Sequence, residues 1–257
     1  MTARVETLFH YPIKGLSAQK LDQVTLRPGE GFPLDRAFGF ARPGSGFDPA
    51  NPKPLPKGKF VVLARDAALA RLQTFYDDQT GMLSIAIGTQ TKRFACGNAD
   101  GAEAAAAFIA EILDYSADMV PTLCTAAPHR FTDVSVVSSA MMNAISLINI
   151  DSVQHFSNTI GYPISADRFR GNILFSGMSA FSELDRIGDE LRVGEAIVKL
   201  VRRTKRCPAT EVNLETGERD LDVPKHLRDS YGHSDMGVYA EVVVGGAIQP
   251  GDVIEWR

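Results

Sequence analysis

The second half of the chain alternates short runs of β-branched and aromatic residues with closely spaced turns that contain glycine. This pattern constrains the fold most, because many short strands at such spacing are typical of a curled sheet or a barrel. The strand-rich runs that we predict are 168–177, 190–207, 210–220 and 237–256.

Helical segments interrupt this β-rich half near its start. A strand over 133–137 is predicted to run into a helix over 138–148, for which Ser138 or Ser139 is a suitable N-cap. A second helix is predicted over 151–161, opened by Asp151.

The first half also combines strands with helices. The predicted strands are 5–13, 20–27, 36–42, 59–64 and 82–87. The predicted helices are 66–76, with Leu69 and Leu72 on one face, and the alanine-rich 101–115. The Pro- and Gly-rich segment 41–59 cannot be helical, so we expect a long loop there, of the kind that often borders a binding site.

Composition restricts the partners of the protein. The 257 residues include 27 Lys and Arg against 31 Asp and Glu, a formal charge of −4. This balance argues against nucleic-acid binding and leaves room for a local basic pocket that takes a small anion. No apolar run suits a signal peptide or a membrane span, and three widely spaced cysteines form no disulfide framework. We therefore expect a cytoplasmic protein with reduced thiols, bound to neither nucleic acid nor membrane.

Cys207 lies in an unusually basic stretch, TKRCPAT. The cations within five residues before it are Arg202, Arg203, Lys205 and Arg206. Nearby cations favour the thiolate form of a cysteine, which would make Cys207 ready for a metal or an electrophile. The alternative is an inert buried cysteine beside a solvated basic strand edge.

Other candidate anion ligands are dispersed along the chain. Arg168 and Arg170 are separated by one residue and are followed by Gly171, and Lys14 and Arg36 lie in the first half. The backbone N–H groups after Ser138 and Ser139 could also meet an anion, although a plain helix cap explains those serines equally well. Dinucleotide, Walker, HExxH and GxSxG motifs are missing from the sequence, and His226 and His233 form no helical ligand pair.

Taken together, these segments resemble the MOSC proteins that carry an N-terminal MOSC β-barrel, a group related to the C-terminal domain of molybdenum cofactor sulfurase and to the amidoxime-reducing component. The matching stretches are YPIKGLSAQKLDQVTLRPGEGFPLDRAFGF, VSVVSSAMMNAI, RFRGNILFSG, FSELDRIGDELRVG, RRTKRCPATEVNLETGERD and GVYAEVVVGGAIQPGD. The resemblance implies a mainly β fold with some α (α+β). It divides the chain into an N-terminal barrel domain, 1–120, and a MOSC barrel domain with short helices, 121–257.

The resemblance also implies a molybdenum cofactor, Mo-molybdopterin, with Cys207 as the protein ligand of the metal and as the catalytic residue. The cofactor-binding residues that it implies are Lys14, Arg36, Ser138, Ser139, Arg170, Asn172 and Arg206. Gly15 and Gly171 depart from the family pattern, which often has serine and proline there, and the tryptophan common near FSELDRIG is missing.

By the same resemblance we expect an oxidoreductase that reduces small N-hydroxylated compounds. Its electrons would come from a separate iron–sulfur or haem protein and a reductase, since no ferredoxin-like segment follows the final GDVIEWR. Two alternatives stay open. Cys207 could carry sulfur as a persulfide, or the protein could bind and deliver the cofactor without catalysis.

Overall fold

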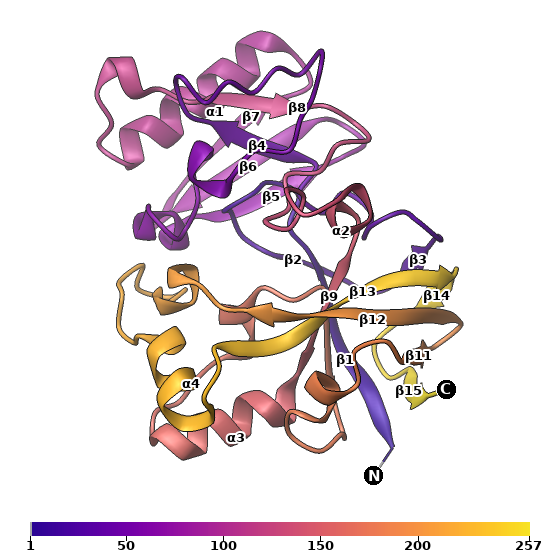
Figure 1. Ribbon diagram of the computed structural model, residues 1–257. Helices are drawn as coiled ribbons and strands as arrows, with labels where there is room; N and C mark the ends of the chain where they lie inside the picture. Colours follow the sequence, from indigo (N-terminus) through magenta and orange to yellow (C-terminus); the bar gives the residue numbers. More distant parts are fainter. Residues whose placement is uncertain (1) are drawn as a thin grey trace.

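The second half of the chain forms a β-barrel. The computed structural model describes residues 2–257. Within that range seven strands close a ring, and β2 (Gln19–Leu21) extends the sheet beside β1. In ring order they are β10 (Ile173–Ser176), β9 (Ile145–Asn149), β13 (Asp235–Val244), β12 (Ala196–Lys205), β11 (Glu190–Val193), β15 (Val253–Trp256) and β1 (Ala3–His10) (Figure 1). The predicted α+β class, with a barrel in the second half, is confirmed.

Alternating side chains fill the barrel. Along β12, Ala196, Val198 and Leu200 point inward and are fully buried, as the two-residue period of a strand requires. Strand β9 is buried on both faces, because α3 (Ile150–Ile160) covers its outer side together with α4 (Val223–Tyr231).

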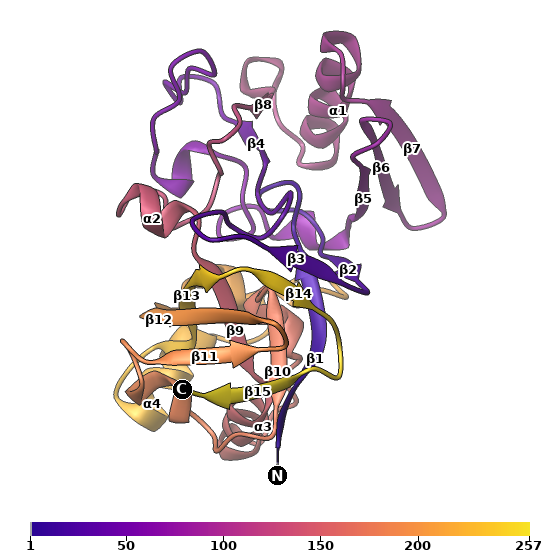
Figure 2. The same cartoon turned by 90° about the vertical axis from the view of Figure 1, so that its right-hand side faces the viewer.

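The first half forms a second β-rich unit above one end of the barrel (Figure 2). Its elements are a three-stranded sheet, β5 (Gln73–Asp77), β6 (Met82–Ile87) and β7 (Gln90–Ala95), the pair β4 (Phe38–Ala41) and β8 (Thr122–Thr125), and helix α1 (Ala99–Ile112). Buried Phe40, Leu83 and Ile109 belong to its core.

The two units share strands. Strand β1, from the start of the chain, closes the barrel between β10 and β15, and β3 (Val24–Leu26) pairs with β14 (Gly246–Ile248) from the end. The division at residue 120 stays a prediction. Any division in sequence nevertheless leaves β1 inside a barrel otherwise built by the second half.

Some of the predicted elements are confirmed and others are wrong. Helices α1 and α3 fall within the predicted 101–115 and 151–161, apart from their first residues. The predicted helix 66–76 is a 3₁₀ turn, Ala67–Arg71, followed by β5, and the predicted helix 138–148 is the short α2 (Ser139–Met142) followed by β9. The predicted strands 59–64, 133–137 and 210–220 are turns and loops with isolated bridges at Phe60 and at Val212.

Among residues 2–257, none of the helices combines the length and apolarity needed to cross a bilayer.

We predict that Gly171→Ala destabilises the protein by about 1–3 kcal/mol. A Cβ at this position would overlap the side chain of Ile148, which is fully buried in the middle of β9. Urea unfolding at neutral pH measures the effect. Gly97→Ala is the matched control, because the nearest atom to its Cβ would lie 4.0 Å away, at Gly81. Equal unfolding midpoints for the two variants would contradict the packing argument.

Candidate functional site

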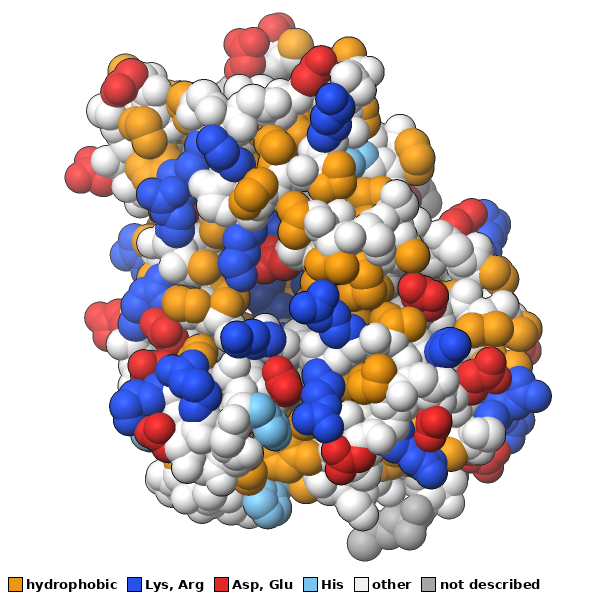
Figure 3. All heavy atoms as spheres, in the orientation of Figure 1, with side chains coloured by type: hydrophobic (Ala, Val, Ile, Leu, Met, Phe, Trp, Pro, Cys, Tyr) orange, Lys and Arg blue, Asp and Glu red, His pale blue; other side chains and the backbone are white. Residues whose placement is uncertain are grey.

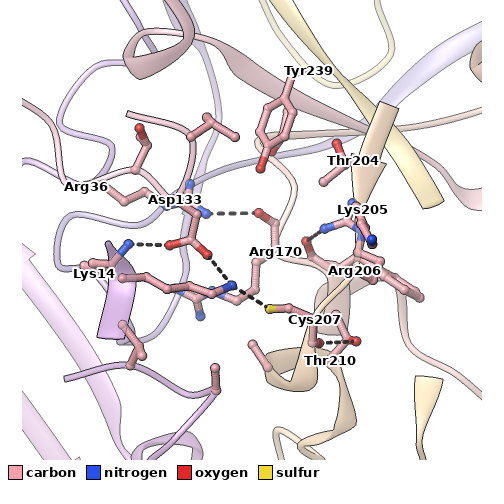
Figure 4. A pocket seen from close by; sticks show the side chains of 18 of the residues that line it. Lys14, Arg36, Asp133, Arg170, Thr204, Lys205, Arg206, Cys207, Thr210 and Tyr239 are labelled. Carbon is pink, nitrogen blue, oxygen red and sulfur yellow. Dashed lines mark hydrogen bonds and ion pairs between the residues drawn. The ribbon is translucent and has the colours of Figure 1, made fainter. Parts of the chain in front are cut away.

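A pocket of about 330 Å³ lies where the N-terminal unit meets the end of the barrel. Lys and Arg side chains gather around a hollow near the middle of the face in Figure 3. The lining residues that matter below are Lys14, Arg36, Lys57, Asp133, Arg170, Asn172, Thr204, Arg206, Cys207 and Tyr239 (Figure 4). Six of the eight predicted site residues therefore come together, from positions 14 to 207, whereas Ser138 and Ser139 are not among the lining residues.

Cys207 follows the end of β12, in extended backbone, and Pro208 starts a 3₁₀ turn directly after it. Its half-buried Sγ lies 2.9 Å from Nζ of Lys57, which donates a hydrogen bond to the sulfur. Burial raises the pKa of Cys124 and raises the pKa of Cys96 to about 11. Among the described residues, Cys207 is the thiol that lines the pocket and contacts a cation.

The pocket carries a large excess of positive charge. Nine of its lining residues are Lys or Arg, whereas two are acidic, Asp35 and Asp133. Asp35 accepts two 2.6 Å hydrogen bonds from Arg36, and Asp133 lies between the ammonium groups of Lys14 and Lys57. In a chain of net charge −4, this concentration of cations predicts an anionic ligand.

Arg202 and Lys205 are exposed, and among the other seven cations Arg170 and Arg206 have no carboxylate partner within residues 2–257. Arg170 stacks 4.3 Å from the ring centroid of Tyr11, and Arg206 donates to the carbonyls of Met236 and Phe169, at 2.8 and 2.9 Å. Desolvation lowers the pKa of each guanidinium to about 10, so both stay charged at neutral pH. A desolvated charge without a counter-ion is costly, and an anionic ligand would relieve that cost.

Two buried tyrosines accompany the cations: Tyr239 lines the pocket, and Tyr11 packs against two of its arginines. Arg36 and Arg170 both lie over the ring of Tyr11, at 4.2 and 4.3 Å, in cation–π geometry. Burial raises the pKa of Tyr11 to about 12 and also raises the pKa of Tyr239. Both phenols therefore keep their protons at neutral pH, and the hydroxyl of Tyr11 donates to the carbonyl of Gly171 at 3.3 Å.

The guanidinium of Arg168 is engaged by the protein and has a structural role. It forms hydrogen bonds of 2.6 and 3.0 Å with Asp220 and also reaches the carbonyls of Thr210 and Glu211. Thr210 in turn donates from its amide and its hydroxyl to the carbonyl of Cys207, at 3.0 and 2.9 Å. This clamp fixes the backbone that follows the thiol.

Asn172 is engaged by the protein on both ends of its amide. Its Oδ1 accepts from the backbone and hydroxyl of Ser146, and its Nδ2 donates to the carbonyl of Phe9 at 3.2 Å. It therefore ties β1 to the start of β9, and its contact with a cofactor stays a prediction. Gly15 has a positive φ of 84°, and a Cβ there would lie 2.8 Å from the carbonyl oxygen of Val61, which explains why this chain has glycine.

Sequence reasoning missed Lys57, Asp133, Thr204 and Tyr239. Lys57 does lie in the loop 41–59, which was expected to border a site, but no pattern singled it out. Asp133 follows an unremarkable FT dipeptide. Desolvation in the pocket raises the pKa of its carboxyl, but Lys14 and Lys57 outweigh this and hold that pKa below its ordinary value. The buried hydroxyl of Thr204 has no hydrogen-bond partner within the described chain.

Cys207 also lines a second, more open pocket of about 480 Å³. Its remaining walls are Lys57, Lys205, Arg206, Pro208, Glu211, Asp222, Pro224 and Arg228. Cys207 therefore lines both the cationic pocket and this wider one. In the described part of the chain, no three His, Cys, Asp or Glu side chains are placed to hold a metal ion together.

Fold and pocket together define a β-barrel protein with one thiol among clustered cations. Residues 130–255 match the MOSC domain, and residues 2–108 match the MOSC N-terminal beta barrel domain. The chain belongs to the MOSC proteins that carry this N-terminal barrel domain, which confirms the resemblance seen in the sequence.

Two curated relatives and one solved structure extend the comparison. Mitochondrial amidoxime-reducing component 1 of Xenopus laevis is 29% identical over 136 residues, which is 48% of this chain and 39% of that protein. Mitochondrial amidoxime reducing component 2 of Rattus norvegicus is 30% identical over 122 residues, 43% of this chain and 36% of that protein. The matches thus span under two fifths of those relatives. The YUAD protein of Bacillus subtilis covers 99% of this chain and 94% of its own, at 14% identity and a TM-score of 0.42.

We predict that Asp220→Asn weakens the Arg168 clamp and lowers the free energy of unfolding at pH 7 by about 1–3 kcal/mol. The hydrogen bond from Arg168 lowers the pKa of Asp220 to about 2. Its ordinary value is about 3.9, so the stabilisation is complete above pH ~4 and is lost as the pH falls toward 2. Urea unfolding of both proteins at pH 7, 5 and 3 measures this difference.

Asp229→Asn is the control for this series, because its ion pair with Lys225 is exposed. We expect it to change stability little at any of these pH values. A difference between wild type and Asp220→Asn that grows at low pH would contradict the assignment.

Proposed function

We propose that the pocket around Cys207 holds the molybdenum cofactor and that the protein is a reductase of N-hydroxylated compounds. The observation that carries the proposal is the position of the Cys207 thiol, in contact with Lys57 and in a pocket lined by nine basic and two acidic residues. A soft thiolate suits a transition metal, and the cations suit an anionic organic group.

The residues present fit such a group. Cys207 would ligate the metal, and Arg170 and Arg206 would neutralise the anionic parts of the cofactor, together with Lys14 and Arg36. The unpartnered hydroxyl of Thr204 is one further polar atom at the pocket wall. When bound, the cofactor supplies a metal centre that can take up and pass on two electrons.

The reaction that we propose follows the names of the two relatives, which are amidoxime-reducing components. An amidoxime would take up two electrons and two protons, its N–O bond would break, and an amidine and water would leave. The more open pocket, which Cys207 also lines, would give a small substrate a path to the thiol. The protonated Nζ of Lys57 places positive charge beside the sulfur throughout. A separate iron–sulfur or haem protein with its reductase would supply the electrons.

The first test is the molybdenum content of protein purified from a host that makes the cofactor. We expect close to one molybdenum per chain in the wild type and a large loss in Cys207→Ser, because a hydroxyl is a poor substitute for a soft thiolate. Cys96→Ser is the matched control and should keep its metal, since Cys96 does not line the pocket. Elemental analysis and the fluorescence of the oxidised pterin measure metal and organic part separately.

A wild type that lacks both metal and pterin would overturn the proposal. Mass spectrometry of the intact protein would then show whether Cys207 carries one extra sulfur, which is the mark of a sulfur carrier. Pterin without turnover would instead favour a binding or delivery role.

The second test is turnover. We predict that the metal-loaded protein, supplied with electrons by a haem or iron–sulfur donor and its reductase, converts an amidoxime to the amidine. Cys207→Ser should lose at least about 100-fold in rate, as expected when a covalent ligand of the reacting centre is removed. Amidine formation followed by chromatography measures the rate. Loaded protein that forms no amidine with any such donor would exclude this reaction.

A further inference from the structure

The carboxylate of Asp133 lies inside the cationic pocket, in the region where an anionic ligand would be held. One oxygen accepts a hydrogen bond from Nζ of Lys14, and the other lies 3.1 Å from Nζ of Lys57. In Figure 4 it lies between Lys14 and Cys207, and Arg36 and Arg170 surround it. The side chain of Asp133 is 44% exposed, whereas that of Lys14 is 5% exposed. The carboxylate therefore faces the open part of the pocket and covers a buried cation.

The other acidic residue of the pocket has a different role. Asp35 is only 6% exposed, pairs with its neighbour Arg36 and accepts from the backbone N–H of Tyr11 at 2.9 Å. It fixes the turn that presents Arg36. Asp133 accepts no hydrogen bond from a backbone N–H within the described chain, and it belongs to a stretch of turns, 133–137, rather than to a helix or strand.

The segment around Asp133 is also loosely packed on one side. Val136 and Val137 are about half exposed, although both are apolar, and Val137 lines the same pocket. The segment lies outside the strands, since β8 ends at Thr125, α2 begins at Ser139 and β9 begins at Ile145. A side chain on such a segment can leave the pocket without disturbing a strand.

We propose that Asp133 is an internal competitor for the anion site: its carboxylate neutralises Lys14 and Lys57 in the free protein, and an incoming phosphate-bearing ligand displaces it. The inference rests on the proposed function only for the anionic character of the ligand. The carboxylate lowers the affinity of the pocket for anions and stabilises the empty protein by covering buried Lys14.

A competitor and a ligand-positioning residue give opposite results when the charge is removed. If Asp133 competes, Asp133→Asn removes one negative charge from the pocket, and anions bind more tightly. The empty protein then loses stability, because Lys14 loses its counter-ion. If Asp133 instead holds Lys14 and Lys57 in place for the ligand, the same variant binds anions more weakly.

The experiment uses full-length protein from a host that cannot make the cofactor, with inorganic phosphate and pyrophosphate as probes. Calorimetric titration at constant ionic strength gives the dissociation constants, and thermal unfolding gives the melting temperature without and with the probe. We expect Asp133→Asn to bind pyrophosphate about tenfold more tightly than the wild type, since unit charges a few ångströms apart interact strongly in a partly buried pocket. We also expect it to melt at a lower temperature without the probe.

Two variants control for charge and for size. Asp229→Asn changes the net charge by the same amount at an exposed ion pair outside the pocket, and its affinity should equal that of the wild type. Asp133→Glu keeps the carboxylate and should bind pyrophosphate no more tightly than the wild type. If Asp133→Asn fails to fold, the comparison moves to Lys14→Met and Lys14→Met/Asp133→Asn, of which the double variant should bind more tightly.

Equal or weaker binding of pyrophosphate by Asp133→Asn overturns the inference, as does the absence of binding by both proteins. The proposed function is tested independently by the molybdenum content of the wild type. Loaded wild type with an unaltered affinity in Asp133→Asn would remove the competitor and leave the cofactor proposal intact.

Discussion

The pairing of β1 with β10 and β15 is the contact on which the pocket depends. Val5 pairs with Phe175 on one side, and Ala3 with Ile254 on the other, so the first strand of the chain completes a barrel that the second half leaves open. The hydrogen bond from the amide of Phe9 to the carbonyl of Asn172 continues this seam to the barrel end. There the chain turns at Tyr11 and delivers Lys14 beside residues that follow it by more than a hundred positions. Together with the pairing of β3 and β14, this seam fixes the cations of the first half relative to Cys207.

Charge then determines what the pocket can hold. Salt bridges to residues outside the pocket neutralise Arg168 and Arg203, through Asp220 and Asp185. These two arginines therefore act as structural elements, which leaves Arg170 and Arg206 as the uncompensated charges that are partly buried in the pocket, since Arg202 and Lys205 are exposed. Because backbone carbonyls hold Arg206 and the ring of Tyr11 supports Arg170, neither guanidinium needs a carboxylate to keep its place. Such preorganised positive charge binds an anion with little rearrangement.

The sequence allowed the fold class, the two main helices and most of the cationic residues to be predicted. Helix α1 was predictable because its alanines have high intrinsic helix propensity, and the segment does form a helix in the fold. The helix predicted over 66–76 was wrong. The spacing of Leu69 and Leu72 suits a helix, but the residues from Gln73 onward form β5, which pairs with β6. Residues 145–148 misled for a similar reason, since a strand buried on both faces has no alternation to reveal it.

Lys57 and Asp133 show what the sequence could not give at the site. A lone lysine or aspartate has no local pattern, and their partners lie 150 and 119 positions away, at Cys207 and Lys14. Only the closed fold brings them together.

Lys57 and Asp133 also connect the thiol of Cys207 with the cations around Lys14. Nζ of Lys57 contacts Sγ of Cys207 at 2.9 Å and the carboxylate of Asp133 at 3.1 Å, so one ammonium group is shared between the thiol and the carboxylate. If an anion displaces Asp133, Lys57 loses one of its two partners and Cys207 is the one that remains among the described residues. Occupation of the anion site and the electrostatic environment of the thiol are thus coupled through a single side chain, which is carried by the proline-rich loop of the other unit.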